Sequence, residues 1–338
     1  MAEHIAPGDS EHTNPYRSDG KLYGFVCVVT GATQPVGKAI VAELATHGAA
    51  CIYACSSSES DPYDALVSSM ASQFPNTKVI PYPYHATSEE ATLGLIDDVL
   101  NAWGRLDGTL LPSREPSHLK HIHLVANPTP TPHLTLHCAV WTSSTGLLGS
   151  PSITATGPAD LLAAFETNAM PAFFALKYAP AAMTKTTTQR GNYPNAAPKD
   201  VPYGSIVVVS SVAATYGGCW GPSFTMSSHA ALGVVRAGVA VLKGTGVRIN
   251  AVTAGQIDVG VDLEAAGLEE LEKGQFPPVT LQSVETQKRV VGLERAGRPE
   301  EVGRVVGFLA SGFSSYVTGA EIRVDGGASV MNPLTVPV

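Results

Sequence analysis

A segment near the amino terminus, Thr30–Gly37, has the residue types that bind a pyrophosphate. It lies between an apolar, β-branched run at Leu22–Thr30 and a stretch with apolar residues at helical spacing, Val36–His47. In such a strand–turn–helix unit, the free N–H groups at the start of the helix favour an anion. The segment therefore predicts a dinucleotide-binding turn.

Three residues of this turn would have distinct tasks. Gly31 makes the tight turn, and Gly37 lets the helix pack closely on the strand. Pro35 stands where a middle glycine is usual. Because proline has no N–H, we expect one phosphate contact fewer than in the usual site.

The end of the second expected strand bears on the choice of cofactor. An acidic residue there would hydrogen-bond a ribose 2′-hydroxyl and repel a 2′-phosphate. This chain has Ser56 and Ser57 instead. The absence of a carboxylate favours NADP(H) over NAD(H), although a serine run is also common in an ordinary turn.

Strand-like and helix-like segments alternate along the chain, which is typical of a parallel sheet covered by helices. We predict an α/β, Rossmann-type doubly wound sheet of about seven parallel strands with helices on both faces, in a single domain. The expected strands are Leu22–Thr30, Cys51–Cys55, Lys78–Tyr82, Ser205–Ser211, Val247–Thr253 and Glu321–Val324, with a fourth one after Gly104–Asp107. The expected helices are Val36–His47, Thr87–Trp103, Pro158–Met183 (bent near Pro171), Phe224–Lys243 and Pro299–Ser311.

Several segments fall outside this alternation. Residues 1–20 and 331–338 are expected to be tails around the domain at 21–330, and residues 185–203 a polar, Pro-rich surface loop. Residues 109–138 interrupt the fourth strand, whose expected continuation comes only at 139–146. A structureless loop of that length is improbable inside a domain, so we interpret the block as an atypical insertion, with a translated intron as the hypothesis.

Composition narrows the class of protein. Hydrophobic residues make up 44% and charged residues 15% of the chain, and apolar runs stop short of the length of a membrane span. The net charge of −8 argues against a nucleic-acid partner. Five scattered cysteines and no secretory leader suggest a cytoplasmic protein without disulfides, acting on a small molecule.

The order of motifs resembles the short-chain dehydrogenase/reductase (SDR) superfamily from about residue 22 to 328. The motifs that carry the resemblance are Thr30–Gly37, Gly104–Asp107, Asn168, Gly204–Ser211, Gly246–Val252, Ala254–Gly255, Ala296–Val302, Val317–Gly319 and Val324–Gly327. The resemblance implies a homodimer or homotetramer formed through Pro158–Met183 and Phe224–Lys243. It also implies cofactor contacts from Gly31, Thr33, Gln34, Val36, Gly37, Ser56, Ser57, Ser143, Gly146, His229, Gly255 and Ile257.

The resemblance fails at the family's proton-delivery pair. The family uses Asn, Ser, Tyr and Lys; Asn168 and Ser211 match the first two. Thr225 (or Phe224, with a gap one residue shorter) replaces the Tyr, which acts as general acid, and His229 replaces the Lys. A ketone that gains a hydride becomes an alkoxide and needs a proton, whereas an iminium ion becomes a neutral amine and needs none. The sequence therefore favours a substrate that is already cationic.

This departure resembles a fungal branch of SDR-derived reductases and Diels–Alderases of prenylated indole alkaloid pathways (malbrancheamide and paraherquamide type). That branch lacks the Tyr/Lys pair, reduces an iminium-bearing intermediate with NADPH and guides a [4+2] cycloaddition. Its reductase activity is associated with an Asp three residues before a Trp; here Gly217 stands three residues before Trp220. Tyr216 and Trp220 would contact the substrate, with packing as the alternative.

Other interpretations remain open. The chain could be an ordinary SDR ketone or alcohol oxidoreductase, or a catalytically silent NADP-binding scaffold. A histidine cluster within 109–138 includes His133 and His137, four residues apart like helical zinc ligands. Prolines directly upstream argue against a helix there, so we predict no metal site.

Overall fold

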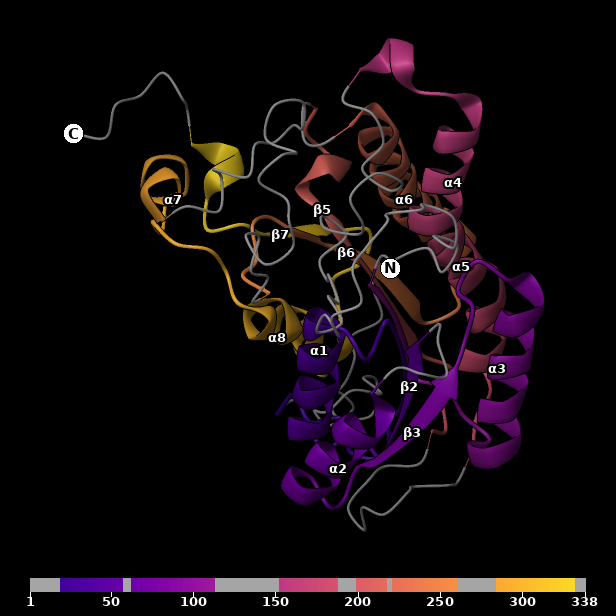
Figure 1. Cartoon of the computed structure of the whole chain (residues 1–338). Helices are drawn as coiled ribbons and strands as arrows, with labels where there is room; N and C mark the ends of the chain where they lie inside the picture. Colours follow the sequence, from indigo (N-terminus) through magenta and orange to yellow (C-terminus); the bar gives the residue numbers. More distant parts are fainter. Residues whose placement is uncertain are drawn as a thin grey trace, which may run out of the picture.

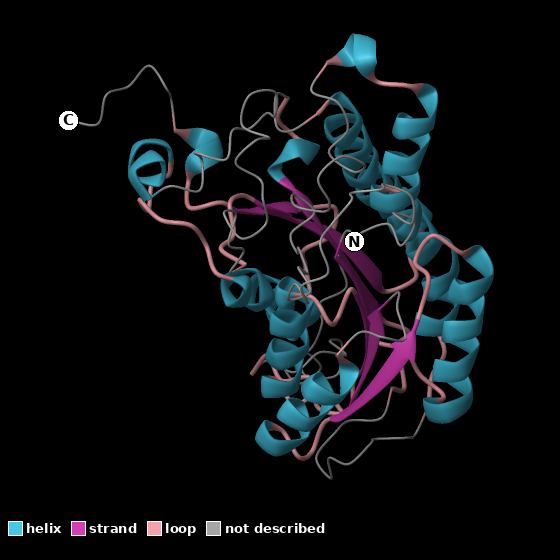
Figure 2. Cartoon of the chain, in the orientation of Figure 1, coloured by secondary structure: helices cyan, strands magenta, loops and turns pink. Residues whose placement is uncertain are grey.

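A sheet of parallel strands forms the centre of the protein (Figure 2). The structure, a computed structural model, describes residues 19–56, 62–112, 152–187, 199–217, 221–259 and 284–331. The strands are β1 (Val26–Thr30), β2 (Cys51–Ser56), β3 (Lys78–Pro83), β4 (Gly108–Pro112), β5 (Gly204–Ser211), β6 (Val247–Ala254) and β7 (Glu321–Val324). Their spatial order is β3-β2-β1-β4-β5-β6-β7, and every neighbouring pair is parallel. The strand order reverses between β1 and β4, and ligands of such sheets bind beyond the carboxyl ends of the strands at that point.

Helices cover both faces of the sheet, as Figure 1 shows. One face carries α1 (Pro35–Thr46), α2 (Tyr63–Gln73) and α8 (Pro299–Ala310). The other carries α3 (Glu89–Trp103), α5 (Met170–Met183) and α6 (Pro222–Val241), with α4 (Pro158–Asn168) packed on α5 and α6. The short helices are η3 (Ile153–Ala155), η4 (Val212–Ala214), α7 (Val284–Val290), η7 (Gly312–Ser314) and η8 (Ala328–Val330). This confirms the predicted doubly wound α/β fold.

Burial on both faces explains why the strands are continuous apolar runs. Along β1, Cys27 and Val29 face the α1/α8 core, whereas Val26 and Val28 face the α3/α5/α6 core. A strand buried on both sides needs apolar residues at every position. Alternation of buried and exposed residues is therefore absent from β1, as it is from β2, β5 and β6.

Two expected elements have different ends. The first strand begins at Val26 rather than Leu22, because Leu22–Phe25 forms a turn in which the Phe25 N–H donates to the Leu22 carbonyl over 2.9 Å. The bend expected near Pro171 is a break between α4 and α5 at Ala169. Pro171 has no N–H to donate four residues back, and it stands in the first turn of α5, where no intrahelical bond is lost.

The fourth strand corrects the predicted insertion. Thr109–Pro112, the first residues assigned to the block 109–138, form most of β4. All four pair with β5, and Thr109 and Leu110 also pair with β1. The strand thus follows directly from Asp107, and the prediction that it resumes only at 139–146 is wrong for its beginning. Residues 113–138 lie outside the described residues.

The amino-terminal end of the sheet is held by a buried carboxylate. Asp107 is fully buried; its Oδ2 accepts from the Arg105 Nε and from the Val26 N–H, each over 2.8 Å. Lys199 Nζ lies 3.3 Å from Asp107 Oδ1 and donates to the Leu106 carbonyl over 2.6 Å. Burial alone would raise the pKa of Asp107, but Lys199 and Arg105 outweigh it and hold that pKa below its ordinary value.

The same contacts correct the predicted surface loop at 185–203. Lys199 is 0% and Tyr203 3% exposed, and the Tyr203 hydroxyl accepts from Arg105 over 2.9 Å. Burial lowers the pKa of the Lys199 ammonium. The polar, Pro-rich composition predicts a surface loop, but the partners of its last residues stand about a hundred positions earlier. Lys199 pairs with Asp107 and Tyr203 with Arg105, and neither pairing can be seen in the local sequence.

One helix among the described residues meets the length and composition criteria for a membrane span. Helix α6 has 20 residues and a mean hydropathy of 1.2, enough to cross a membrane by length and composition alone. It packs against α4, α5, β5 and β6, and core helices meet the same criterion.

Among the described residues, no group of three His, Cys, Asp or Glu side chains could hold a metal ion.

Candidate functional site: a dinucleotide turn and an altered catalytic helix

The turn between β1 and α1 has the geometry of a phosphate cradle. Gly31 has a φ of +62°, which favours glycine. A β-carbon on Gly37 would lie 2.0 Å from the Gly31 carbonyl oxygen, so this position admits no side chain. The first helical turn therefore packs directly on the turn backbone.

Pro35 begins α1, where its missing N–H costs no intrahelical hydrogen bond. The first bond of the helix runs from the Lys38 N–H to the Gln34 carbonyl over 2.6 Å. The N–H groups of Val36 and Gly37 precede that bond, and such groups bind anions at helix N-termini. Two of the predicted phosphate contacts thus remain available despite Pro35.

Two hydrogen bonds join the turn to the end of β2. The Ala32 N–H donates to the Cys55 carbonyl, and Thr33 Oγ1 bonds Ser56 Oγ, each over 2.9 Å. Thr33 and Ser56 are 3% and 4% exposed. The structure therefore brings these two predicted cofactor residues together. Ser57, Ser143 and Gly146 lie outside the described residues.

The buried side-chain oxygen of Gln34 fits a bound dinucleotide. Its Oε1 is buried and has no hydrogen-bond partner among the described residues, although burying an acceptor in this way is costly. A hydroxyl of a cofactor lying on the turn would satisfy it. Together with the cradle that a Gly37 β-carbon would fill, this atom indicates that the residues present fit a nicotinamide dinucleotide.

The other predicted cofactor residues lie at the same edge of the sheet. Gly255 follows β6, and a β-carbon there would lie 2.6 Å from the Asp325 β-carbon. The Gly255 N–H donates to the Val324 carbonyl over 2.9 Å. Ile257, 5% exposed, pairs with Gly297 through an isolated parallel bridge. Since β1 and β6 are parallel, Gly31 and Gly255 both stand at carboxyl ends.

Ser211 ends β5 and is 1% exposed. Its Oγ accepts from the Ala213 N–H over 3.2 Å and so caps η4. The hydroxyl proton of Ser211 is not used in that bond, so it can still donate to a substrate atom.

Asn168 makes a contact that the sequence did not reveal. Its Nδ2 donates to Ser227 Oγ over 2.9 Å, and Ser227 Oγ donates to the Phe224 carbonyl over 3.1 Å. Both side chains are buried. Asn168 thus links the end of α4 to α6. Ser227 is one of several small polar residues at the start of α6, beside Ser223, Thr225 and Ser228, so the sequence did not single it out.

The positions of the missing pair lie on α6. Phe224 is 1% exposed and belongs to the interior, whereas Thr225 is half-buried and His229 is exposed. His229 Nδ1 lies 2.9 Å from the Thr225 carbonyl oxygen. Phe224 has no hydroxyl, and the alcohol of Thr225 is not acidic enough to replace a tyrosine as proton donor.

Tyr216 is held against β7. Arg323 donates to its hydroxyl, and the guanidinium carbon lies 5.1 Å from its ring centroid. The preceding Thr215 donates to Glu321 Oε1 over 2.6 Å. Tyr216 therefore has a partner on β7, and its contact with a substrate stays a prediction. Trp220 lies outside the described residues.

The fold and the turn define an α/β protein with a dinucleotide cradle at the switch point of its sheet. Residues 25–111 match the family profile described as short chain dehydrogenase, and residues 133–329, more than half of the chain, match the profile described as enoyl-(acyl carrier protein) reductase. The chain belongs to the short-chain dehydrogenase/reductase superfamily, a family of oxidoreductases that bind NAD or NADP.

Individual relatives agree with this assignment. The chain is 28% identical to a 3-oxoacyl-(acyl-carrier-protein) reductase of Thermotoga maritima, over 91% of this chain and 98% of the relative. It is 33% identical to a short-chain dehydrogenase/reductase of Botryotinia fuckeliana, over 37% of this chain and 45% of the relative. A short-chain dehydrogenase/reductase structure from Mycobacterium ulcerans superposes with a TM-score of 0.66 at 21% identity, covering 92% of this chain and 91% of that one, and thus shows the same fold.

Proposed function

We propose that this protein is an atypical, NADP(H)-dependent SDR that transfers a hydride to an iminium-bearing intermediate of secondary metabolism. The observation that carries the proposal is the combination of a cofactor turn that keeps its first and last glycines with a catalytic helix that lacks its acid. Gly31 and Gly37 keep the cradle, while Thr225 and His229 stand where the Tyr and Lys would be.

When bound, NADPH supplies the hydride. Addition to the carbon of an iminium ion forms a C–H bond, moves the C=N π electrons to nitrogen and leaves a neutral amine and NADP⁺. No proton is consumed, so the reaction needs no general acid. Ser211 would orient the substrate through its hydroxyl proton, and the exposed imidazole of His229 would bond the nicotinamide ribose.

Two features support NADP(H) over NAD(H). The described end of β2 has the Ser56 hydroxyl and no carboxylate that would repel a 2′-phosphate. Ser57, next in the sequence, adds a second hydroxyl. Titration of both reduced cofactors by fluorescence tests this preference; tighter binding of NADH would contradict it.

The substrate class rests on the resemblance to the fungal reductases and Diels–Alderases. We infer an indole alkaloid precursor, with the same pocket guiding an intramolecular [4+2] cycloaddition after reduction or in place of it. Gly217 offers a direct test, because a β-carbon there would meet no described atom within 4 Å. We expect Gly217→Asp, which restores the carboxylate of that branch, to raise the rate of iminium reduction.

The decisive experiment measures NADPH consumption with a matched pair of indole-bearing substrates, one a ketone and one an iminium. Turnover of the iminium alone is expected. Turnover of the ketone would contradict the proposal and favour an ordinary SDR reductase. If NADPH binds and neither substrate is reduced, product stereochemistry separates a cyclase from a silent NADP-binding scaffold.

A further inference from the structure

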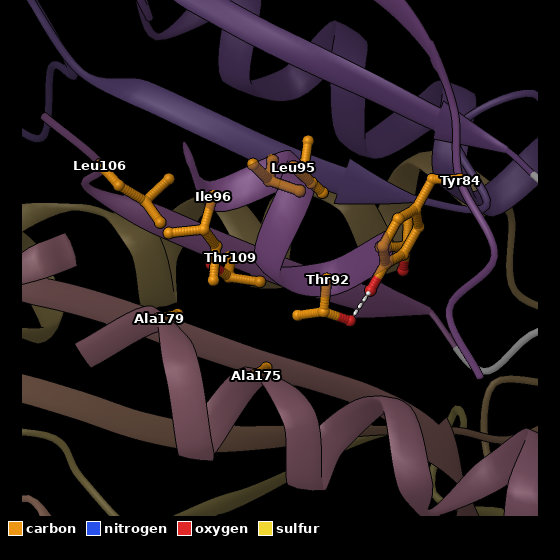
Figure 3. A pocket seen from close by; sticks show the side chains of 10 residues that line it. Tyr84, Thr92, Leu95, Ile96, Leu106, Thr109, Ala175 and Ala179 are labelled. Carbon is orange, nitrogen blue, oxygen red and sulfur yellow. Dashed lines mark hydrogen bonds between the residues drawn. The ribbon is translucent and has the colours of Figure 1, made fainter. Parts of the chain in front are cut away.

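A small cavity lies between the sheet and the helices α3 and α5 (Figure 3). Its volume is about 20 Å³. Its walls are mostly apolar, but four side chains bring hydroxyl groups. These are Thr30, Tyr84, Thr92 and Thr109.

Thr109 has an unsatisfied hydroxyl at this cavity. The residue is 7% exposed, and its Oγ1 has no hydrogen-bond partner among the described residues. In the register of β1 and β4, Thr109 stands beside Val28. Thr30 follows Val28 by two positions, so Thr30 and Thr109 share one face of the sheet as diagonal neighbours on adjacent strands.

Thr92 offers a second polar group at the cavity. Thr92 donates its proton to the Ser88 carbonyl over 2.9 Å. The Tyr84 hydroxyl, 2.9 Å from Thr92 Oγ1, must therefore be the donor of that pair (Figure 3). Thr92 Oγ1 accepts this one hydrogen bond and keeps a second lone pair, so the cavity wall offers an acceptor beside the hydroxyl of Thr109.

Size and polarity together select the ligand. A water molecule needs about 10–15 Å³ of such space and two to four polar partners, and purely apolar cavities of this size stay dry. The cavity meets both conditions and has no room for a larger molecule. We propose that it binds one ordered water molecule, which accepts the Thr109 hydroxyl proton and donates to neighbouring wall oxygens.

This site has a structural consequence for the dinucleotide turn. Thr30 is the last residue of β1 and directly precedes Gly31. A water shared by Thr109 and the wall hydroxyls ties β4 to the end of β1 at the base of that turn.

The test compares two isosteric substitutions. Thr77, 5% exposed, also has an unpartnered Oγ1 but does not line the cavity. We expect Thr77→Val to raise the urea midpoint of unfolding, because it removes an unsatisfied buried hydroxyl. Thr109→Val is expected to lower the midpoint, because it removes a hydroxyl that water satisfies and leaves that water one partner short.

A crystal structure of the wild-type protein supplies the second readout. Electron density for a water within hydrogen-bond distance of Thr109 Oγ1 is expected, and it should be lost in Thr109→Val. A midpoint that rises in Thr109→Val as it does in Thr77→Val overturns the proposal. So does a wild-type cavity without that density, whether or not the variants fold.

Discussion

The carbonyl oxygen of Gly31 occupies the space that a side chain on Gly37 would need, with only 2.0 Å to an added β-carbon. Gly37→Ala must therefore displace the turn backbone itself. We expect the Kd for NADPH to rise at least about tenfold, equivalent to about 1.4 kcal/mol. Fluorescence titration of NADPH measures the effect.

Gly94 provides a matched control for this substitution. It lies on the exposed face of α3, where a β-carbon would meet nothing within 4 Å. Gly94→Ala should leave the Kd unchanged and stabilise the protein by up to about 1 kcal/mol, since alanine is the better helix former. Equal binding by both variants would refute the assignment of the turn as a phosphate cradle.

Substitutions of Asn168 and Ser227 can show whether Asn168 still acts in catalysis or only in packing. If their 2.9 Å hydrogen bond is structural, a double-mutant cycle with Asn168→Ala and Ser227→Ala should give a coupling energy of about 1 kcal/mol in unfolding. The rate of iminium reduction should fall less than about tenfold in Asn168→Ala. A loss of 10²–10⁴-fold, the range expected for a positioned proton donor, would show that a relay still operates.

At the scale of elements, Asp107 joins three segments at the amino-terminal edge of the sheet. It accepts from Val26 at the start of β1, from Arg105 before β4, and faces Lys199 before β5. Asp107→Asn leaves two buried cations without their anion, which we expect to cost about 3–5 kcal/mol of the free energy of unfolding. Glu89→Gln is the control: Glu89 forms an exposed pair with Lys177, and solvent screening should make the loss of this pair barely detectable in unfolding.

The decrease in the free energy of unfolding at low pH should depend on the Asp107 carboxylate. The pKa of Asp107 lies below its ordinary value of about 3.9 in the folded protein, so its stabilisation is complete above that value. It is lost as the pH falls through the folded pKa. Urea unfolding between pH 7 and pH 3 should therefore show wild type and Asp107→Asn converging below about pH 4; a constant difference would contradict this role.

At the scale of the whole molecule, the sequence predicted the elements that repeat a simple pattern and missed those that depend on distant partners. Apolar runs such as Val26–Thr30 and Val247–Ala254 can be predicted as strands from the sequence alone, because buried parallel strands need apolar residues throughout. The burial of Lys199 depends on Asp107, and the contact of Asn168 depends on Ser227, 59 positions later. Neither pairing leaves a local signature, so neither could be predicted.

The cofactor turn was predictable for a related reason. Its function requires glycines at set places on a local strand–turn–helix unit, and Gly31 and Gly37 are where that unit requires them. The substrate side is built from the ends of several strands and from segments far apart in the chain. Tyr216, for example, bonds Arg323 of β7, 107 positions later, a contact that the local sequence does not reveal.

The last prediction concerns assembly. We propose a homodimer or homotetramer formed through α4, α5 and α6, since each of these helices exposes a large apolar side chain: Leu162, Phe173 and Met226, at 64%, 40% and 37%. Large apolar side chains exposed on a surface are candidates for burial in an interface. Sedimentation of wild type should give a dimer or larger species, and Leu162→Glu combined with Phe173→Glu should shift it towards the monomer. Leu293→Glu, at a residue 62% exposed beyond α7, is the control and should leave the assembly intact. If wild type sediments as a monomer, or the control dissociates as readily as the double variant, association through these helices is ruled out.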